Sequence, residues 1–263
     1  MRTEVVTLPG SPERPNEDWA AAALPGPGGG GTVVALDGVT PPAGDDGCVH
    51  GVPWFTARLG GALTELSASR PDLTLTEILA LAIRRTAEAH RDTCDLSHVR
   101  TPQATVALAR WDADTVEHLV LSDAALLLEA PDGAVRAVLD DRLDRVPPEV
   151  LRSSAATDRL RNREGGFFTA AADPAVADRA VTGTTPRSRV RALAALTDGA
   201  TRWVAPFAEG DWADCAGVLR TEGAFGLIRR VRAREAADGA AGVTRRGKPH
   251  DDATAVYAVL QDL

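Results

Sequence analysis

Cysteine is scarce in this chain of 263 residues, which contains only Cys48, Cys94 and Cys215. Their number is odd, and no two of them form a Cys-x-x-Cys pair. Disulfide frameworks and structural zinc sites are typically built from paired cysteines at short, regular spacings. The sequence therefore favours small, buried, reduced thiols in a reducing compartment over a disulfide-bonded domain or a zinc site.

The sequence also lacks a long hydrophobic segment. A membrane-spanning helix needs about 20 consecutive apolar residues, and no stretch of this chain approaches that length. The first ten residues, MRTEVVTLPG, carry one positive charge followed by a strand-like pattern, where a signal peptide has an apolar core. We therefore expect a cytoplasmic protein.

Positive charge is in deficit, because 29 lysines and arginines face 37 aspartates and glutamates, for a net charge of −8. Nucleic acids and anionic membranes require a basic protein surface. The composition therefore argues against both as partners. A site for divalent cations suits an acidic chain better, because such ions take carboxylate and carbonyl oxygens as ligands.

Several motifs of nucleotide-binding and covalent enzymes are missing. The glycine-rich segment PGPGGGG (25–31) lacks the Gly-Lys-Ser/Thr of a phosphate-binding loop and no helix follows it, so we expect a hairpin loop. The chain contains neither a G-x-S-x-G motif nor a Cys-Arg nucleophile signature. These absences agree with chemistry that needs no protein nucleophile.

The pattern of apolar residues predicts an α+β protein, with helices between groups of antiparallel strands. Residues 17–24 can be extended or helical, and 189–197 can be a strand or a short helix. No linker divides the chain, so we expect a single domain over 1–263, with an irregular insertion or flap at 141–188 and a glycine-rich loop at 238–250. The expected strands are 4–8, 32–36, 104–110, 115–121, 125–130, 134–139 and 253–260, and the expected helices are 52–69, 74–90, 147–156, 203–221 and 223–236.

Acidic residues lie at the ends of predicted strands in several separate places. Each has an ordinary explanation, since aspartate is common in turns, and Asp112, Asp114 and Asp132 fit that explanation. Taken together, the others could supply the three or four carboxylates of a two-metal site. They are Glu17-Asp18, Asp37-Gly38, Ser122-Asp123, Asp198-Gly199 and Asp251-Asp252.

Six short motifs extend this pattern over nearly the whole chain. They are RPNED (14–18), VVALDG (33–38), QATVALAR (103–110), LSDAALLL (121–128), LTDGATR (196–202) and DDATAVYAVL (251–260). Each is weak alone. In this order they resemble the motifs of the metal-dependent type 2C (PPM-type) protein serine/threonine phosphatases, in particular the bacterial single-domain form.

The resemblance implies a fold, a reaction and a set of residues. The fold is a four-layer α-β-β-α sandwich of two antiparallel sheets flanked by helices. The reaction is hydrolysis of phosphoserine or phosphothreonine in a phosphorylated protein by a hydroxide that bridges two Mg²⁺ or Mn²⁺ ions. Asp37 would bridge both ions, and the Gly38 carbonyl would bind one of them. The other implied residues are Asp198 and Asp251 on the second ion, Glu17 and Asp18 acting through water, Asp123 with Asp198 at a third, weaker ion, and Arg14 on the phosphate.

The motifs depart from the family pattern at accessory positions. Arg14 stands three residues before Glu17, where the family has four, and DGVTPP lacks the histidine or paired glycines that follow Asp-Gly in relatives. His50 could replace that histidine, although a residue at a helix start is the favoured interpretation. Ser122, Ala124 and Asp252 replace a glycine, a serine and an asparagine. A catalytically weak or inactive regulatory module and a phosphatase for small molecules remain alternatives.

Three further features have open interpretations. His250, next to Asp251, could be a general acid, although an exposed loop histidine is favoured. Phe167-Phe168 could belong to a lid over the site or to the core. The arginines at 229, 230, 232 and 234 are typical of the solvated face of a helix.

Overall fold

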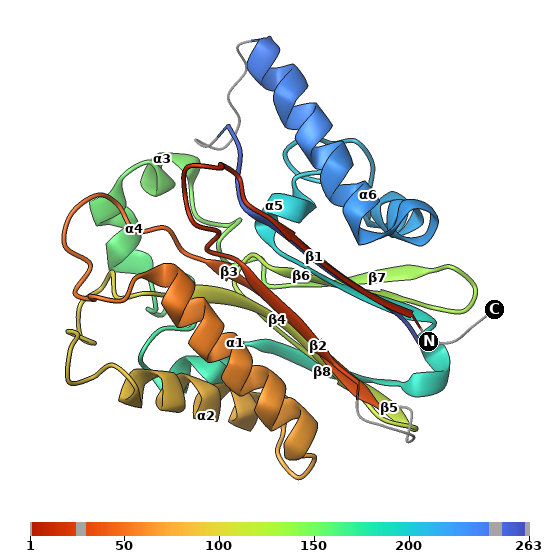
Figure 1. The fold of residues 1–263 in the computed structure, drawn as a ribbon, viewed down its shortest axis with the longest axis horizontal. Coiled ribbons are helices and arrows are strands. Elements are labelled where there is room, and N and C mark those ends of the chain that lie inside the picture. Colours follow the sequence, from red (N-terminus) through yellow and green to blue (C-terminus); the bar gives the residue numbers. More distant parts are fainter. Residues whose placement is uncertain (1, 25–29, 242–248, 261–263) are drawn as a thin grey trace.

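The computed structural model describes residues 2–24, 30–241 and 249–260, and its strands form two five-stranded antiparallel sheets (Figure 1). The strand order is β1-β10-β9-β6-β7 in one sheet and β2-β3-β4-β5-β8 in the other. The strands are β1 Arg2–Leu8, β2 Trp19–Ala23, β3 Gly31–Gly38, β4 Ala104–Trp111, β5 Thr115–Leu121, β6 Ala125–Glu129, β7 Val135–Leu139, β8 Val181–Pro186, β9 Ala192–Leu196 and β10 Ala253–Val259.

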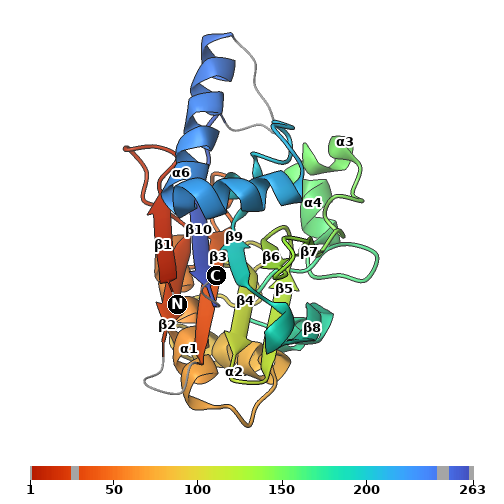
Figure 2. The same ribbon diagram turned by 90° about the vertical axis from the view of Figure 1, so that its right-hand side faces the viewer.

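Helices cover the outer face of each sheet (Figures 1 and 2). Helices α1 (Val52–Ser69) and α2 (Leu75–Glu88) pack on the sheet that contains β3, and α6 (Trp212–Ala240) packs on the other. The short helices α3 (Pro148–Leu151) and α4 (Ser154–Leu160) lie at one end of the sandwich. The remaining short elements are α5 Asp198–Thr201, η1 Pro174–Arg179 and η2 Arg187–Arg189. The predicted four-layer α-β-β-α sandwich is confirmed.

Strand β3 shows how the layers are held together. Val33 and Ala35 pack between the two sheets, whereas Val34 and Leu36 pack against α1 and α2. All four side chains are fully buried. Burial on both faces explains why this strand reads as a continuous apolar run without alternation. The run ends at Asp37, which therefore lies at the rim of the sandwich.

The ends of α2 and α6 follow from local sequence signals. The predicted capping box of α2 is present, because the Glu77 amide donates to the Thr74 side chain and the Thr74 amide donates to Glu77 Oε2 at 2.8 Å. Helix α6 changes direction at Gly223, whose φ of 75° is left-handed, and Glu4 Oε2 accepts from the Ala224 amide there at 2.8 Å. The predicted break between the two last helices is confirmed, since Gly223 separates them.

The structure resolves both ambiguous segments and corrects three predictions. Residues 17–24 contain β2, and 189–197 contain β9. The helix expected from 203 begins only at Trp212, and α6 continues to Ala240, into the expected glycine-rich loop. The segment 141–188 is not irregular throughout, because it contains α3, α4, η1 and the edge strand β8. Periodicity missed β8 because VTGTTP is short and contains no run of apolar residues.

Parts of two predictions lie outside the described residues, namely 25–29 of the hairpin loop and 242–248 of the glycine-rich loop. Within the described chain, none of the helices is long and apolar enough to span a membrane.

The two adjacent glycines of α1 provide a test of the contact between α1 and β2. A Cβ atom on the buried Gly60 would lie 2.0 Å from Cε3 of Trp19, whereas Gly61 is exposed and has open space around it. We expect Gly60→Ala to lower the free energy of unfolding by about 1–3 kcal/mol through overpacking. Gly61→Ala should raise it by about 0.5–1 kcal/mol, because alanine favours the helix. Urea unfolding measures both, and equal effects would contradict this packing.

Candidate active site

Five aspartates from separate elements gather at the end of the sandwich where β3 terminates. Burial raises the pKa of Asp37 well above its ordinary value, and four neighbouring carboxylates raise it further. These belong to Asp198, Asp18, Asp123 and Asp251. Asp37, Asp123, Asp198 and Asp251 line one cavity of about 230 Å³, together with Gly38. The structure thus brings together the aspartates that the sequence singled out.

Strand pairing explains why these distant residues meet. Leu196 of β9 pairs with Ala255 of β10 on one side and with Ala125 of β6 on the other. Because both pairs are antiparallel, the end of β9 adjoins the starts of β10 and β6. Asp198, which follows β9, therefore lies beside Asp251, which precedes β10, and near Asp123, which precedes β6.

The other sheet contributes Asp18 and Asp37 in the same way. Trp19 pairs with Leu36, so the residues beyond this pair, Asp18 and Asp37, are neighbours. A hydrogen bond joins the two sheets here, because Thr197 Oγ1 donates to Asp18 Oδ2 at 2.8 Å. Asp18 thereby lies close to the end of β9 and Asp198.

The glycines of both Asp-Gly pairs are required by close backbone approach. A Cβ on Gly38 would lie 2.5 Å from the Glu17 carbonyl oxygen, and one on Gly199 would lie 1.8 Å from the Asp252 carbonyl oxygen. Neither glycine has a left-handed φ. Each glycine lets a second acidic segment pack directly against the strand end. The Asp-Gly pairs are therefore not the hairpin turns that their composition also suggests.

Asp252 anchors the segment that carries Glu17. Its carboxylate accepts hydrogen bonds from the Gly10 and Glu17 amides, each at 2.7 Å. The hydroxyl of Thr40 in turn donates to Glu17 Oε2. Because Asp252 receives two donors, an acceptor-only carboxylate suits this position, where the family pattern has asparagine. Glu17 is held beside the cavity by these contacts but does not line it.

Asp18 has an environment that suits a cation. Burial, followed by the nearby charges of Asp198 and Asp252, raises the pKa of Asp18 to about 8. Its Oδ1 atom is buried and has no hydrogen-bond partner among the described residues. Repelling carboxylates and an unpaired buried oxygen are costly alone and are relieved by a positive ion. The donors are all oxygen, which fits Mg²⁺ or Mn²⁺.

Ser122 adopts an unusual conformation that places Asp123. Its φ is 67°, in the left-handed region where glycine is favoured. The Ser122 amide donates to Asp140 Oδ2 at 2.8 Å, and Arg142 pairs with Asp140. The glycine that the family pattern has here is therefore replaced by a serine that keeps the glycine-like backbone, supported by a buried carboxylate.

The arginine at the cavity differs from the one expected. Arg14 is exposed and is not among the residues that line the cavity. Arg161, directly after α4, does line it. Burial lowers the pKa of Arg161, while the charges of Asp158 and Asp123 act in the opposite direction. Sequence reasoning missed Arg161 because it lies in the weakly periodic segment 141–188, among several other arginines.

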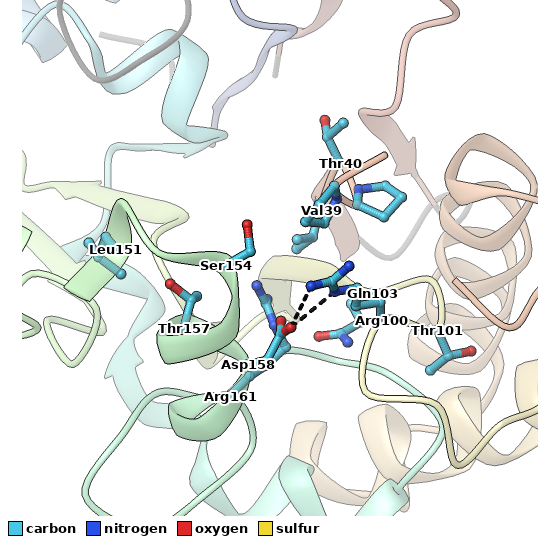
Figure 3. A pocket seen from close by; sticks show the side chains of 12 residues that line it. Val39, Thr40, Arg100, Thr101, Gln103, Leu151, Ser154, Thr157, Asp158 and Arg161 are labelled. Carbon is cyan, nitrogen blue, oxygen red and sulfur yellow. Dashed lines mark hydrogen bonds and ion pairs between the residues drawn. The ribbon is translucent and has the colours of Figure 1, made fainter. Parts of the chain in front are cut away.

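A second cavity shares part of its wall with the first, and Figure 3 shows the residues that line this second cavity. It has a volume of about 180 Å³. Val39, Thr40, Leu151, Thr157 and Arg161 line both cavities. Figure 3 also shows the ion pair between Arg100 and Asp158 beside Arg161. The carboxylate cluster thus opens into a longer groove between the loop after β3 and helix α4.

The histidine candidates and the phenylalanines have structural partners. Nδ1 of His250 lies 2.9 Å from Oε2 of the buried Glu235. His50 stacks on Trp54 with ring centroids 4.3 Å apart. Phe167 and Phe168 are buried, so both belong to the core, although Phe167 also lines the cavity.

Two of the four arginines at 229, 230, 232 and 234 form ion pairs or hydrogen bonds with other segments, which a fully solvated helix face would not do. Arg232 pairs with Glu235 and donates to the Leu8 and Pro9 carbonyls, and Arg234 pairs with Glu209 and Asp238.

Solved structures match this architecture over almost the whole chain. Serine/threonine phosphatase Stp1 from Staphylococcus aureus is 11% identical, with a TM-score of 0.61 over 99% of this chain and 95% of that one. The chain has the fold of the type 2C (PPM-type) serine/threonine phosphatases. The S. agalactiae serine/threonine phosphatase is 14% identical (TM-score 0.61, 98% and 100% covered). PppA of Pseudomonas aeruginosa, described as a key regulatory component of T6SS, is 16% identical, with a TM-score of 0.57 over 97% of this chain and 96% of that one. No protein-family model and no curated protein matches the sequence.

The raised pKa of Asp18 leads to a prediction on stability. An aspartate ionises at about pH 3.9 in an unfolded chain, whereas Asp18 does so at about 8 in the folded protein. The folded state therefore binds more protons between these values, and stability falls as pH rises. Asp18→Asn removes this cost. In the presence of chelator, the melting temperature of the variant should therefore exceed that of the wild type, and the difference should grow from pH 5 to pH 8. Each kcal/mol of difference in the free energy of unfolding corresponds to about 2–4 °C.

Asp112→Asn serves as a control of opposite sign. Backbone amides, first that of Thr115, hold the pKa of Asp112 below its ordinary value. This carboxylate therefore contributes stability above its unfolded pKa, and its loss should destabilise the protein at neutral pH. The proposed repulsion would be contradicted if the difference in melting temperature between Asp18→Asn and the wild type did not widen as pH rises.

Proposed function

We propose that this protein is a metal-dependent phosphomonoesterase that removes phosphate from phosphoserine or phosphothreonine in proteins. The observation that carries the proposal is the convergence of five aspartates at one end of a phosphatase fold, where four of them line one rim cavity. Such a cluster of carboxylates in a partly buried site has little stability value of its own, because like charges repel. It is readily explained as a ligand set for divalent cations.

The proposed ligands are those that the family pattern implies. Asp37 and the carbonyl of Gly38 would hold Mg²⁺ or Mn²⁺, with Asp198 and Asp251 on a second ion. Glu17 and Asp18 would act through water, and Asp123 with Asp198 would serve a third, weaker site. When bound, such ions lower the pKa of water and neutralise charge on a phosphate.

The chain's own residues would orient the substrate. Among the described residues that line the cavity, Arg161 is the only basic one beside four aspartates, and guanidinium groups bind phosphate oxygens bidentately. It is thus better placed for this role than Arg14. Thr40 fixes the Glu17 side chain, and Asp252 fixes the Glu17 backbone. These contacts would keep the acidic residues in place before any ligand arrives.

The shape of the site supports a phosphorylated protein as substrate. The groove continues beyond the carboxylates past Val39 and Thr157 to Arg100 and Asp158. A phosphate at the acidic cavity would leave this second cavity for the residues that flank it in a peptide. A small phosphorylated metabolite would not need the second cavity, so a substrate panel separates the two. Residues 1–263 would act as one catalytic domain, and its expected location is the cytoplasm.

Replacement of one proposed ligand tests the activity directly. We expect the wild type to hydrolyse p-nitrophenyl phosphate with added Mn²⁺ and not in chelator. Asp198→Asn should lower kcat by at least about 100-fold, because a neutral amide cannot replace a carboxylate ligand on a divalent cation.

Asp132→Asn is the matched control, since Asp132 lies in an exposed turn where its Oδ1 accepts from the Ala134 amide. This variant should remain as active as the wild type. An Asp198→Asn variant that retains full activity would overturn the proposed metal role. A protein that binds no Mn²⁺ in calorimetry would instead favour the inactive regulatory module.

A pair of arginine variants tests how the phosphate is held. We expect Arg161→Gln to lower kcat/KM by about 10- to 100-fold, which corresponds to the loss of one charge-assisted hydrogen bond. Arg14→Gln should change kcat/KM less than threefold or so, because Arg14 is exposed and outside the cavity lining. Melting curves exclude unfolding as the cause. The reverse ranking of the two variants would assign the phosphate to Arg14.

A further inference from the structure

Two of the three cysteines meet in the structure, at a place separate from the carboxylate cavity. Cys48 lies in the loop between β3 and α1, and Cys94 lies in the loop that follows α2. Their Sγ atoms are 3.0 Å apart. Nδ1 of His90 lies 3.5 Å from Cys48 Sγ. One ligand atom from each of the three residues falls within 4.8 Å of the other two.

We propose that Cys48, His90 and Cys94 form a binding site for a zinc-class divalent cation. Two thiolates and an imidazole are the donors that zinc prefers, whereas Mg²⁺ prefers oxygen. The inference does not rest on the proposed phosphatase activity, because it involves other residues and a different class of metal. The expectation of small buried thiols holds only for Cys215, because Cys48 and Cys94 are only partly buried.

The distance from Cys48 to His90 suits a metal, and the two sulfur atoms are too far apart for a disulfide. A disulfide requires an S–S distance of about 2.05 Å, and both cysteines are free at 3.0 Å. With Zn–S near 2.3 Å and Zn–N near 2.05 Å, a tetrahedral site has an S–N edge of about 3.5 Å. The distance from Cys48 to His90 matches that edge. The two sulfur atoms would need to separate by about 0.7 Å to reach the S–S edge of the same site.

His90 is held in a fixed orientation by packing. Its side chain is buried, and its ring lies 5.1 Å from that of Trp54 and 6.4 Å from that of Phe55. The Nε2 atom is buried and has no hydrogen-bond partner among the described residues. Because packing already immobilises the ring, little further entropy is lost when Nδ1 binds a ligand, although Nε2 would then carry a buried N–H with no acceptor among the described residues. Cys48 and Cys94 are only half-buried, which leaves water access for a fourth ligand.

The site joins the two loops that form one wall of the groove. The loop after β3 supplies Val39 and Thr40, and the loop after α2 supplies Arg100, Thr101 and Gln103 (Figure 3). Backbone hydrogen bonds already connect the loops, from Val39 to Gln103 at 2.9 Å and from Asp95 to Gly47 at 2.7 Å. A metal bound by Cys48, His90 and Cys94 would link the same two loops at a further point and so hold the groove wall in one conformation.

Cobalt titration of the full chain tests the site. The protein is purified with a phosphine reductant, stripped with chelator and titrated with Co²⁺, whose thiolate complexes absorb in the visible and near ultraviolet. We expect thiolate–cobalt absorption that saturates at one tetrahedral site per chain and is displaced by Zn²⁺, whereas Co²⁺ bound in the carboxylate cavity adds no thiolate absorption. Cys48→Ser and Cys94→Ser should each weaken Co²⁺ binding by at least about tenfold.

Two control variants separate this site from other causes. Cys215→Ala removes the buried thiol of α6 and should leave the cobalt spectrum unchanged. Asp198→Asn should also leave it unchanged, so failure of the phosphatase proposal would not affect this result. Hydrogen exchange gives a second readout, in which Zn²⁺ should slow exchange of residues 39–51 and 89–103 in the wild type but not in Cys48→Ser.

Three outcomes would overturn the proposal. They are the absence of a thiolate–cobalt spectrum, a spectrum that survives in both serine variants, and a Cys48–Cys94 disulfide in mass spectra of unreduced protein together with no metal binding after reduction. The last outcome would make the pair a redox-active dithiol and not a metal site.

Discussion

Electrostatic repulsion among carboxylates is the constraint on which this structure depends. Five aspartates gather at one rim, where burial and mutual charge raise the pKa of Asp37 and bring that of Asp18 to about 8. A flexible chain would separate these groups. Here they belong to strand ends whose positions are fixed by two sheets with a fully buried apolar interface. The hydrophobic core therefore supports an arrangement that is unfavourable by itself and that a bound cation would relieve.

Close backbone packing converts this rim into a defined site. Gly38 and Gly199 follow the two central aspartates, and each lies against the backbone of another acidic segment. Asp252 then accepts from the Gly10 and Glu17 amides, and Thr197 joins the sheets through Asp18. Acidic residues thus act in two ways, some facing the cavity and some holding the chain that carries the others. Asp252, which replaces an asparagine of the family pattern, falls in the supporting group.

The rest of the groove comes from segments outside the sheets. Helix α4 brings Asp158 and, directly after its end, Arg161, and the loops after β3 and α2 bring Val39, Thr40 and Arg100. These segments vary most easily, because no sheet register restrains them. They carry the features that would distinguish one substrate from another, and the Cys48–His90–Cys94 cluster lies where it can stiffen two of them. Metal chemistry and substrate selection would therefore be assigned to different parts of the fold.

The sequence alone determined the layered α+β fold, most helices and strands, and the acidic strand ends that meet at the rim. Local patterns carry these features, since burial on one or both faces dictates apolar periodicity and Asp-Gly marks the ends of β3 and β9. Only the tertiary structure decided that Arg161 and not Arg14 lines the cavity, that β8 completes a sheet, and that Cys48 and Cys94 are in contact across 46 positions. These facts depend on which loops the packed sheets bring side by side, and no short-range pattern in the chain encodes that proximity.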